Sequence, residues 1–271
     1  MTIETQAQVT GATQLIGIVG DPVAQVRSPQ IYNRRIAGRG RNAVLVPLHL
    51  ASGQFEDAMP ALLRIRNLVG LIFTVPFKER AAAFADRIMP VGRQVEAVNA
   101  MRREADGGWT ADMFDGAGLV HALAEMGVAP AGKRILLLGA GGAGRAIAIS
   151  LAREGARALT LFDLDPGRAA RIAGDVRRFY PECDARETAA PAASGHDIVI
   201  NATPVGMAAG DGLPAPLGAL DPSCVVFDIV PQPSVTPLMS YAIEAGCRVG
   251  SGQLMIQGQA DAVLDFLRLG N

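Results

Sequence analysis

Short apolar runs alternate with mixed polar and apolar stretches along most of the chain. In the first half, three apolar runs predict strands, at 15–19, 43–48 and 69–73. Each is followed by a helical pattern, beginning at Pro29, near Phe55 and near Lys78. Strand and helix in alternation are typical of a small α/β unit with a parallel sheet.

A hairpin is predicted before the middle of the chain. Two further strand patterns, Ala97–Arg103 and Trp109–Met113, flank the turn sequence Asp106-Gly107-Gly108. Asp-Gly between apolar runs is a strong signal for a tight turn. The stretch from Asp115 to about Met126 then predicts a helix that carries the chain into its second half.

The second half opens with a complete strand–loop–helix–strand pattern. The apolar run Ile135–Leu138 leads into Gly139-x-Gly141-x-x-Gly144, a helical stretch follows to Gly155, and a second apolar run ends at Asp163. Two later apolar runs predict further strands, at 198–200 and 225–229. This alternation predicts a parallel, doubly wound sheet.

Each glycine of this pattern has a physical use in a dinucleotide site. Gly139 allows the tight turn, Gly141 lets the backbone approach a pyrophosphate, and Gly144 lets the helix pack closely on the strand. The helix N-terminus, with Gly142 and Ala143 in its first turn, favours negative charge. An ordinary glycine-rich loop is the alternative, but strand, helix and terminal acid all stand at the expected places.

Asp163 bears on which nucleotide is bound. A carboxylate at the end of the second strand accepts hydrogen bonds from the adenosine ribose and repels a 2′-phosphate. We therefore expect NAD as the cofactor. Arg168 stands near enough in the sequence to keep NADP open, although it is equally compatible with a solvated position in the next helix.

Composition limits the classes of partner. The chain has 271 residues, 49% hydrophobic and 19% charged, with a formal net charge of −1 and no basic block. We expect neither nucleic acid nor membrane as a partner. The polar start lacks the features of a signal peptide, and no apolar stretch is long enough for a membrane span, so a cytoplasmic protein is expected.

Cysteine and histidine usage gives no sign of a metal site. The three cysteines stand at 183, 224 and 247, without CxxC spacing. Reduced, structural thiols are therefore expected. The three histidines, at 49, 121 and 196, show no ligand spacing, and we predict no metal.

Several motifs follow one another in a characteristic order. They are Gly20-Asp21-Pro22 with Ser28-Pro29 and Asn33; Thr74-Val75-Pro76-Phe77-Lys78; Ala97-Val98-Asn99; Asp115-Gly116-x-Gly118; the glycine-rich loop; Asn201-Ala202-Thr203-Pro204-x-Gly206-Met207; Thr236-Pro237-Leu238; and Met255 with Gln259. Over nearly its whole length the chain resembles the shikimate/quinate dehydrogenase family. The resemblance implies an α/β fold with an N-terminal substrate domain and a Rossmann-type doubly wound dinucleotide-binding domain.

The resemblance also implies domain boundaries. Residues 1–115 correspond to the substrate-binding and catalytic domain, and residues 116–250 to the NAD(P)-binding domain. Residues 251–271 correspond to a C-terminal helix that returns to the substrate domain. A small-molecule substrate is implied, with a monomer or a homodimer as the assembly.

Lys78 and Asp115 are the catalytic candidates. In the family these motif positions face each other across the substrate cleft. Oxidation of an alcohol requires loss of the hydroxyl proton as hydride leaves carbon, so Lys78 is expected as general base and Asp115 as the group that orients it. Taken alone, Lys78 is compatible with a solvated helix start and Asp115 with a helix cap.

Further site residues follow from the resemblance. Hydrogen bonds to the hydroxyl or carboxylate groups of the substrate are assigned to Ser28, Thr74, Asn99 and Gln259. Gln257 is a competing alignment for the last of these positions. Elements that close over the cofactor are assigned to Asn201, Thr203, Pro204, Met207 and Met255. Turn or core roles remain alternatives for each.

The chain departs from the family pattern on the substrate side. Val26 stands where the family has the first serine of its SxSP motif, and Pro231 stands where it has a tyrosine. In the family these two groups and the serine at Ser28 hold a substrate carboxylate; Arg27 could replace them if its side chain turned inward. Taken as a whole, the resemblance implies an NAD(P)-dependent alcohol dehydrogenase for a hydroxylated alicyclic acid. A family dehydrogenase for a different cyclic polyol, or a non-catalytic nucleotide or metabolite sensor, is the alternative.

Overall fold

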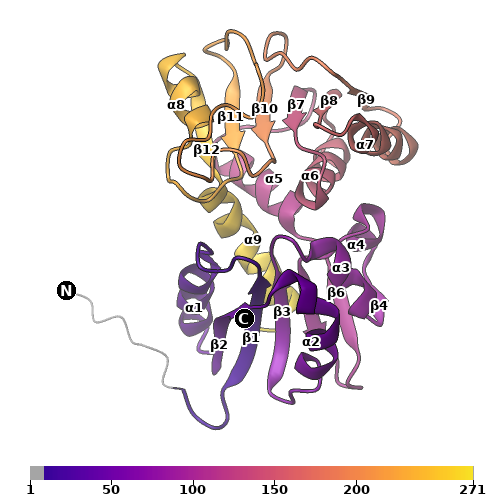
Figure 1. Cartoon of the computed structure of the whole chain (residues 1–271), viewed down its shortest axis with the longest axis vertical. Coiled ribbons are helices and arrows are strands. Elements are labelled where there is room, and N and C mark those ends of the chain that lie inside the picture. The colour runs from indigo at the N-terminus through magenta and orange to yellow at the C-terminus, as the bar shows by residue number, and fades with distance from the viewer. Residues whose placement is uncertain (1–8, 271) are drawn as a thin grey trace, which may run out of the picture. The chain divides into compact units, whose positions relative to one another are not determined.

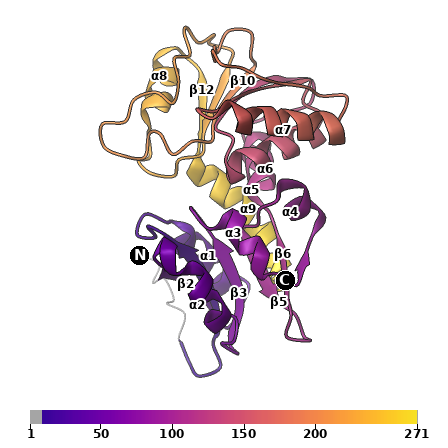
Figure 2. The same ribbon diagram turned by 45° about the vertical axis from the view of Figure 1, so that its right-hand side comes forward.

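The computed structural model describes residues 9–270 (Figures 1 and 2), so most of the polar start lies outside the described residues. The chain divides into two compact units. Unit 1 comprises the chain up to Phe114 together with the segment from Ala260 onward, and unit 2 is Asp115–Gln259. The chain therefore passes between the units twice, and unit 1 is built from two separate stretches of sequence.

Unit 1 contains a mixed six-stranded sheet in the order β2-β1-β3-β5-β6-β4. The strands are β1 (Gln14–Gly20), β2 (Ala43–His49), β3 (Leu68–Phe73), β4 (Arg87–Ile88), β5 (Ala100–Arg103) and β6 (Trp109–Asp112). The first three are mutually parallel, whereas β5 runs antiparallel to both β3 and β6. The helices are α1 (Ser28–Gly38), α2 (Phe55–Leu62), α3 (Lys78–Ala81) and α4 (Pro90–Val95).

Unit 2 contains a parallel six-stranded sheet in the order β12-β11-β10-β7-β8-β9. Its strands are β7 (Arg134–Leu138), β8 (Ala158–Phe162), β9 (Asp184–Glu187), β10 (Ile198–Asn201), β11 (Val225–Asp228) and β12 (Arg248–Ser251). The helices are α5 (Asp115–Glu125), α6 (Gly142–Arg153), α7 (Pro166–Phe179), α8 (Pro237–Glu244) and α9 (Gly252–Phe266), the last of which extends into unit 1. From β7 the chain adds β8 and β9 on one side of the sheet, and then β10, β11 and β12 on the other side. Doubly wound sheets bind dinucleotides at this switch point, which here lies between β7 and β10.

An aromatic cluster forms part of the core of unit 1. The Phe55 and Phe77 rings are stacked with centroids 4.3 Å apart, and Phe73 meets Phe55 edge-on at 6.1 Å. All three side chains are fully buried. Since Phe73 ends β3 and Phe77 precedes α3, this packing fixes the turn between them.

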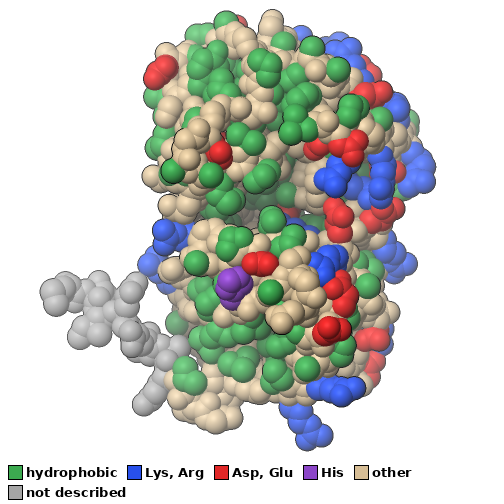
Figure 3. Space-filling view, in the orientation of Figure 1, with side chains coloured by type: hydrophobic (Ala, Val, Ile, Leu, Met, Phe, Trp, Pro, Cys, Tyr) green, Lys and Arg blue, Asp and Glu red, His purple; other side chains and the backbone are tan. Residues whose placement is uncertain are grey.

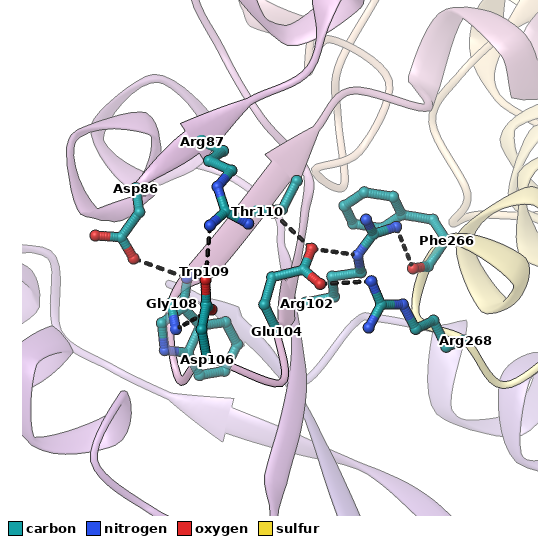
Figure 4. A network of polar contacts seen from close by, with 10 residues as sticks. All are labelled: Asp86, Arg87, Arg102, Glu104, Asp106, Gly108, Trp109, Thr110, Phe266 and Arg268. Atoms are coloured by element: carbon teal, nitrogen blue, oxygen red, sulfur yellow. Dashed lines mark hydrogen bonds and ion pairs between the residues drawn. The ribbon is translucent and has the colours of Figure 1, made fainter.

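A polar network in unit 1 joins the β5–β6 hairpin to the end of the chain (Figure 4). The Glu104 carboxylate accepts hydrogen bonds from Arg102 Nε at 2.9 Å and Thr110 Oγ1 at 2.7 Å, and it pairs with Arg268. Arg102 also donates to the Phe266 carbonyl at 3.0 Å. Glu104 is largely buried, so these donors compensate the desolvation of its charge.

The α/β class expected from the alternating pattern is confirmed, whereas some element boundaries were wrong. The strand expected at 97–103 begins only at Ala100, because Glu96 adopts a left-handed conformation and the Val98 N–H donates to the Lys78 carbonyl rather than to a strand. The strand expected at 225–229 ends at Asp228. The short β4, α4 and β9 were not predicted, since two to six residues carry too little periodicity.

Acidic and basic side chains are interspersed on the face shown in Figure 3. No helix within residues 9–270 is long and apolar enough to cross a membrane. Cys183, Cys224 and Cys247 are free and buried, and burial raises the pKa of the Cys183 thiol to about 11 and that of Cys224 to about 12.

Candidate active site

Thr74 and Lys78 lie on the turn that follows β3 in unit 1. The Thr74 N–H donates to the Val19 carbonyl at 3.0 Å, and the Thr74 carbonyl accepts from the Phe77 N–H at 2.9 Å. Lys78 is the first residue of α3, its carbonyl accepts from the Val98 N–H at 2.8 Å, and its side chain is half-buried. The backbone of this turn, which carries the Lys78 side chain, is therefore hydrogen-bonded to two other segments of unit 1.

The side-chain amide of Asn99 forms a hydrogen bond within unit 1. Its side chain is 3% exposed, and its Oδ1 accepts the Phe114 N–H at 2.9 Å. Its backbone links the neighbouring strand ends, because its N–H donates to the Asp112 carbonyl and its carbonyl accepts from Phe73. Asn99 thus holds the residue that precedes Asp115 in the chain.

The segment that leads into α1 is one of the two places where the chain departs from the family pattern. Ser28 is buried at the start of the helix, Val26 is half-buried and Arg27 is exposed. Asn33 of the same helix exchanges two hydrogen bonds with the backbone of Leu45. These bonds fix α1 against β2, which gives Asn33 a structural use.

Asp115 begins α5 in unit 2 and is buried. The two glycines that follow it explain the spacing of the DGxG motif. A Cβ at Gly116 would lie 2.1 Å from Ser150 Oγ on α6, and one at Gly118 would lie 2.7 Å from the Met255 carbonyl on α9. Only glycine permits these two helix contacts, which set the position of the helix that Asp115 begins.

Met255 and Gln259 lie on α9 beside this glycine. Both side chains are buried, whereas Gln257 is half-buried. The Gln259 Cβ would lie 2.8 Å from a Cβ at Gly118. Within unit 2 the structure therefore brings together the start of α5 and the face of α9 that carries these two side chains.

The glycine-rich loop makes a close turn between β7 and α6. Gly139 has φ +99°, and a Cβ at Gly144 would lie 2.0 Å from the Gly139 carbonyl oxygen. By contrast, a Cβ at Gly141 would meet no atom within 4 Å. Gly141 is the N-cap of α6 and provides no side-chain cap. The first N–H groups of α6 thus face a position open to an anion.

Asp163 follows β8 and supports this loop directly. One carboxylate oxygen accepts the Ala140 N–H at 2.7 Å, and the other accepts the Asp165 N–H at 2.9 Å. A carboxylate has about four acceptor positions, so it retains capacity for ribose hydroxyls. Leu164 is 90% exposed beside it, and Arg168 is exposed with its Nε 3.7 Å from Asp165.

Asn201 and Thr203 shape the loop after β10. The Asn201 Oδ1 accepts from the Thr203 N–H at 3.0 Å and from its hydroxyl at 2.7 Å, while Nδ2 donates to the Val205 carbonyl at 3.0 Å. Asn201 is fully buried, whereas Pro204 and Met207 are exposed on the same loop. The asparagine therefore organises the loop, and Pro204 and Met207 form its outer surface.

Two polar residues that sequence reasoning did not assign to the site complete this region. Asp228, at the end of β11, accepts from Asn201 Nδ2 at 3.0 Å and from the Thr236 hydroxyl at 2.6 Å. Both residues are fully buried. Burial raises the pKa of the Asp228 carboxyl, and its hydrogen bonds oppose that shift. The sequence did carry a signal for this pair, since Asn201 and Asp228 each end an apolar strand and the two strands are successive.

Comparison with known proteins gives concordant matches. Residues 18–101 match the shikimate dehydrogenase substrate binding domain. A shikimate dehydrogenase (NADP(+)) of Rubrobacter xylanophilus is 38% identical over 254 residues, which cover 92% of this chain and 88% of that protein.

Solved structures match over both units. The 5-ketofructose reductase of Gluconobacter sp. strain CHM43, in ligand-free form, has a TM-score of 0.81 at 28% identity, with 94% of this chain and 92% of that one covered. The shikimate 5-dehydrogenase of Listeria monocytogenes, in complex with shikimate and NAD, has a TM-score of 0.84 at 27% identity, with 98% and 95% covered.

The doubly wound sheet and its glycine-rich loop define the class of dinucleotide-binding proteins. The extent and identity of the matches make the assignment narrower. The chain belongs to the shikimate dehydrogenase family. The resemblance inferred from the ordered motifs is thereby confirmed, and so is an NAD(P)-dependent dehydrogenase activity.

Proposed function

We propose that the protein transfers hydride between NAD and a hydroxyl-bearing carbon of an alicyclic substrate of the shikimate or quinate type. The observation that carries the proposal is the joint presence of an anchored Lys78, a buried Asp115 and an open glycine-rich loop in a chain of this family. A non-catalytic sensor would need only the loop. It would have no use for a proton-transferring pair.

The residues have separate tasks in this proposal. Lys78 takes the hydroxyl proton during oxidation and returns it during reduction, and Asp115 orients the lysine and accepts a hydrogen bond from the substrate. Thr74 and Gln259 provide hydrogen bonds to ring hydroxyls. The nicotinamide cofactor, held on the first turn of α6, supplies the hydride chemistry when bound.

NAD is the proposed form of the cofactor, although the Rubrobacter xylanophilus relative is named for NADP(+). The region after β8 presents two carboxylates, those of Asp163 and Asp165, and the Asp165 backbone N–H donates to the Asp163 carboxylate. A 2′-phosphate placed beside them would be repelled. Arg168, the cation that would favour NADP, has its guanidinium group paired with the Asp165 carboxylate, with Nε 3.7 Å away.

A second candidate substrate is a cyclic polyol or keto sugar without a carboxylate. Val26 and Pro231 remove two hydroxyl groups from the positions that hold an acid in the family, and Arg27 is exposed. Similarity to a 5-ketofructose reductase supports this candidate, since a ketose has no carboxylate. The two candidates share the same hydride and proton chemistry.

Initial rates on a substrate panel test the proposal. Shikimate, quinate, carboxylate-free cyclic polyols and keto sugars should be assayed with both NAD(H) and NADP(H), with Lys78→Met as the inactive control. We expect Lys78-dependent turnover of at least one ring substrate, faster with NAD. No turnover of any panel member by a folded protein that binds NADH would favour the sensor instead.

A further inference from the structure

A buried polar cluster lies at the carboxyl ends of β10 and β11 in unit 2. Asn201 and Asp228 are the last residues of these adjacent parallel strands and stand directly opposite each other in the register. Their side chains are joined by a 3.0 Å hydrogen bond, and both are fully buried. Polar groups in such a place need a full set of partners, because each missing hydrogen bond would leave a desolvated group.

The partners come from the two loops that leave these strands. Through Asn201 the cluster holds the Thr203 and Val205 backbone of the loop after β10. Through Asp228 it holds the Val230 N–H at 3.0 Å and the Thr236 hydroxyl at 2.6 Å in the loop after β11. The Asp228 carboxylate therefore receives three donors: it holds the loop after β11 directly, and it holds the Asn201 side chain that bonds the loop after β10.

Thr236 connects this polar cluster to the next helix, α8. Its Oγ1 accepts the Met239 N–H at 3.2 Å and so caps α8 while its own proton is donated to Asp228. Gly206, in the loop after β10, packs against Thr236, since a Cβ on this glycine would lie 3.4 Å from that of the threonine. The two loops are thus in contact, and each is hydrogen-bonded to one of two side chains, Asn201 and Asp228, that are bonded to each other.

The place of this cluster in the sheet indicates its use. In a doubly wound sheet the dinucleotide lies across the carboxyl ends of the strands, with its pyrophosphate at the first strand's loop and its other half on the far side of the reversal point. Here the glycine-rich loop follows β7, and Asp163 follows β8. The half of the sheet formed by β10 and β11 is left for the nicotinamide.

We propose that Asp228 is a positioning residue for the nicotinamide: it fixes the loop after β11 directly, through Val230 and Thr236, and the loop after β10 through Asn201, in the form that holds the ring. The inference rests on the proposed function only in requiring that NADH binds. It assigns Asp228 no contact with the cofactor.

Binding measurements can separate this role from general stabilisation. NADH and ADP-ribose, which lacks the nicotinamide, should be titrated into the wild type, Thr236→Val and Asp228→Asn. In the wild type NADH should bind more tightly than ADP-ribose. Both variants should lose about tenfold in NADH affinity, as expected for one lost interaction of moderate strength, while ADP-ribose affinity stays at the wild-type value.

The chain offers a matched control in the same unit. Thr160 is also a buried threonine, hydrogen-bonded to His196 at 3.0 Å, but it lies within β8, away from the carboxyl ends of β10 and β11. Thr160→Val should leave both affinities unchanged, and Thr236→Ser, which keeps the hydroxyl, should restore NADH binding. Equal losses for NADH and ADP-ribose in Thr236→Val, or no loss for either, would overturn the inference. A wild type that binds neither ligand would instead refute the dehydrogenase proposal.

Discussion

Two individual residues, Lys78 and Asp163, combine a proposed chemical task with a visible structural one. The backbone of Lys78 anchors Val98, and the carboxylate of Asp163 holds the Ala140 N–H. Substitution of either residue can therefore alter the local fold as well as the chemistry. Experiments on these residues need variants that separate the two effects.

Removing the Lys78 amino group should abolish most turnover. Because the Lys78 contact to Val98 uses backbone atoms, Lys78→Ala keeps it while deleting the proton carrier. We expect kcat to fall by about two to four orders of magnitude with little change in NADH affinity. Steady-state kinetics and NADH titration measure both quantities. A kcat near the wild-type value would exclude Lys78 as the general base.

Substitutions at Asp163 should separate cofactor preference from loop support. Asp163→Asn keeps an acceptor for the Ala140 N–H but removes the charge, so the preference for NAD over NADP should narrow while NAD still binds. Asp163→Ala removes the acceptor too, and affinity for both cofactors should fall by roughly tenfold or more. Values of kcat/KM for both cofactors give the comparison. Equal efficiency of the wild type with NAD and NADP would refute the assignment.

Sequence reasoning located residues whose environment is set by nearby sequence. Gly139, Gly141 and Gly144 lie within six successive residues, so their spacing already implies their geometry. The Asp228 cluster was missed because it depends on the register between β10 and β11, which brings together residues 27 positions apart. Roles for Lys78, Asp115 and Gln259 remain predictions, since they were taken from the family resemblance.

Among the elements, the β5–β6 hairpin illustrates what periodicity can and cannot predict. The turn at Asp106-Gly107-Gly108 was expected from its residues, and β5 and β6 do flank it. The use of the hairpin as a dock for the end of α9 was not predictable, because Glu104 and Arg268 are 164 positions apart. Charged pairs so distant in sequence leave no periodic signal.

The contribution of this contact between the hairpin and the C-terminal segment to the free energy of unfolding should depend on pH. Hydrogen bonding by Thr110, and next the two arginines Arg102 and Arg268, hold the pKa of Glu104 below its ordinary value near 4.5. The ionised carboxylate therefore stabilises the native state above about pH 4.5, and this stabilisation is lost as the pH falls through the lowered pKa. Glu104→Gln should cost about 1–3 kcal/mol at pH 7.

Denaturant titrations at several pH values measure this effect. The difference in unfolding free energy between wild type and Glu104→Gln should shrink as the pH falls below 4.5. Glu154→Gln is the control, because Glu154 forms an exposed pair with Arg153 that contributes little. A difference that stays constant with pH would show that the charge of Glu104 does not matter.

For the whole molecule, substrate choice is the property in which family membership and the individual sequence disagree. The family relatives include shikimate dehydrogenases, whereas this chain lacks two of the hydroxyl groups expected at the acid site. Each hydrogen bond to a charged group contributes about 1.5–3 kcal/mol. Without replacement, the loss of both should weaken shikimate binding by roughly two to four orders of magnitude.

Restoring the missing hydroxyls should therefore improve the use of acids. The double variant Val26→Ser, Pro231→Tyr should raise kcat/KM for shikimate chiefly by lowering KM, while turnover of carboxylate-free substrates stays similar. Steady-state kinetics on both substrate types provide the measurement. A low micromolar KM for shikimate in the wild type would refute the altered acid site and favour an ordinary shikimate dehydrogenase.

The division of unit 1 between two stretches of sequence has a consequence for synthesis on the ribosome. Unit 2 is continuous from Asp115 to Gln259, so all of it has been made before the segment from Ala260 onward emerges. That segment supplies buried side chains such as Leu264 and Leu267 to the earlier unit. Unit 1, whose first residues are translated before any of unit 2, can therefore be completed only after all of unit 2 has been synthesised.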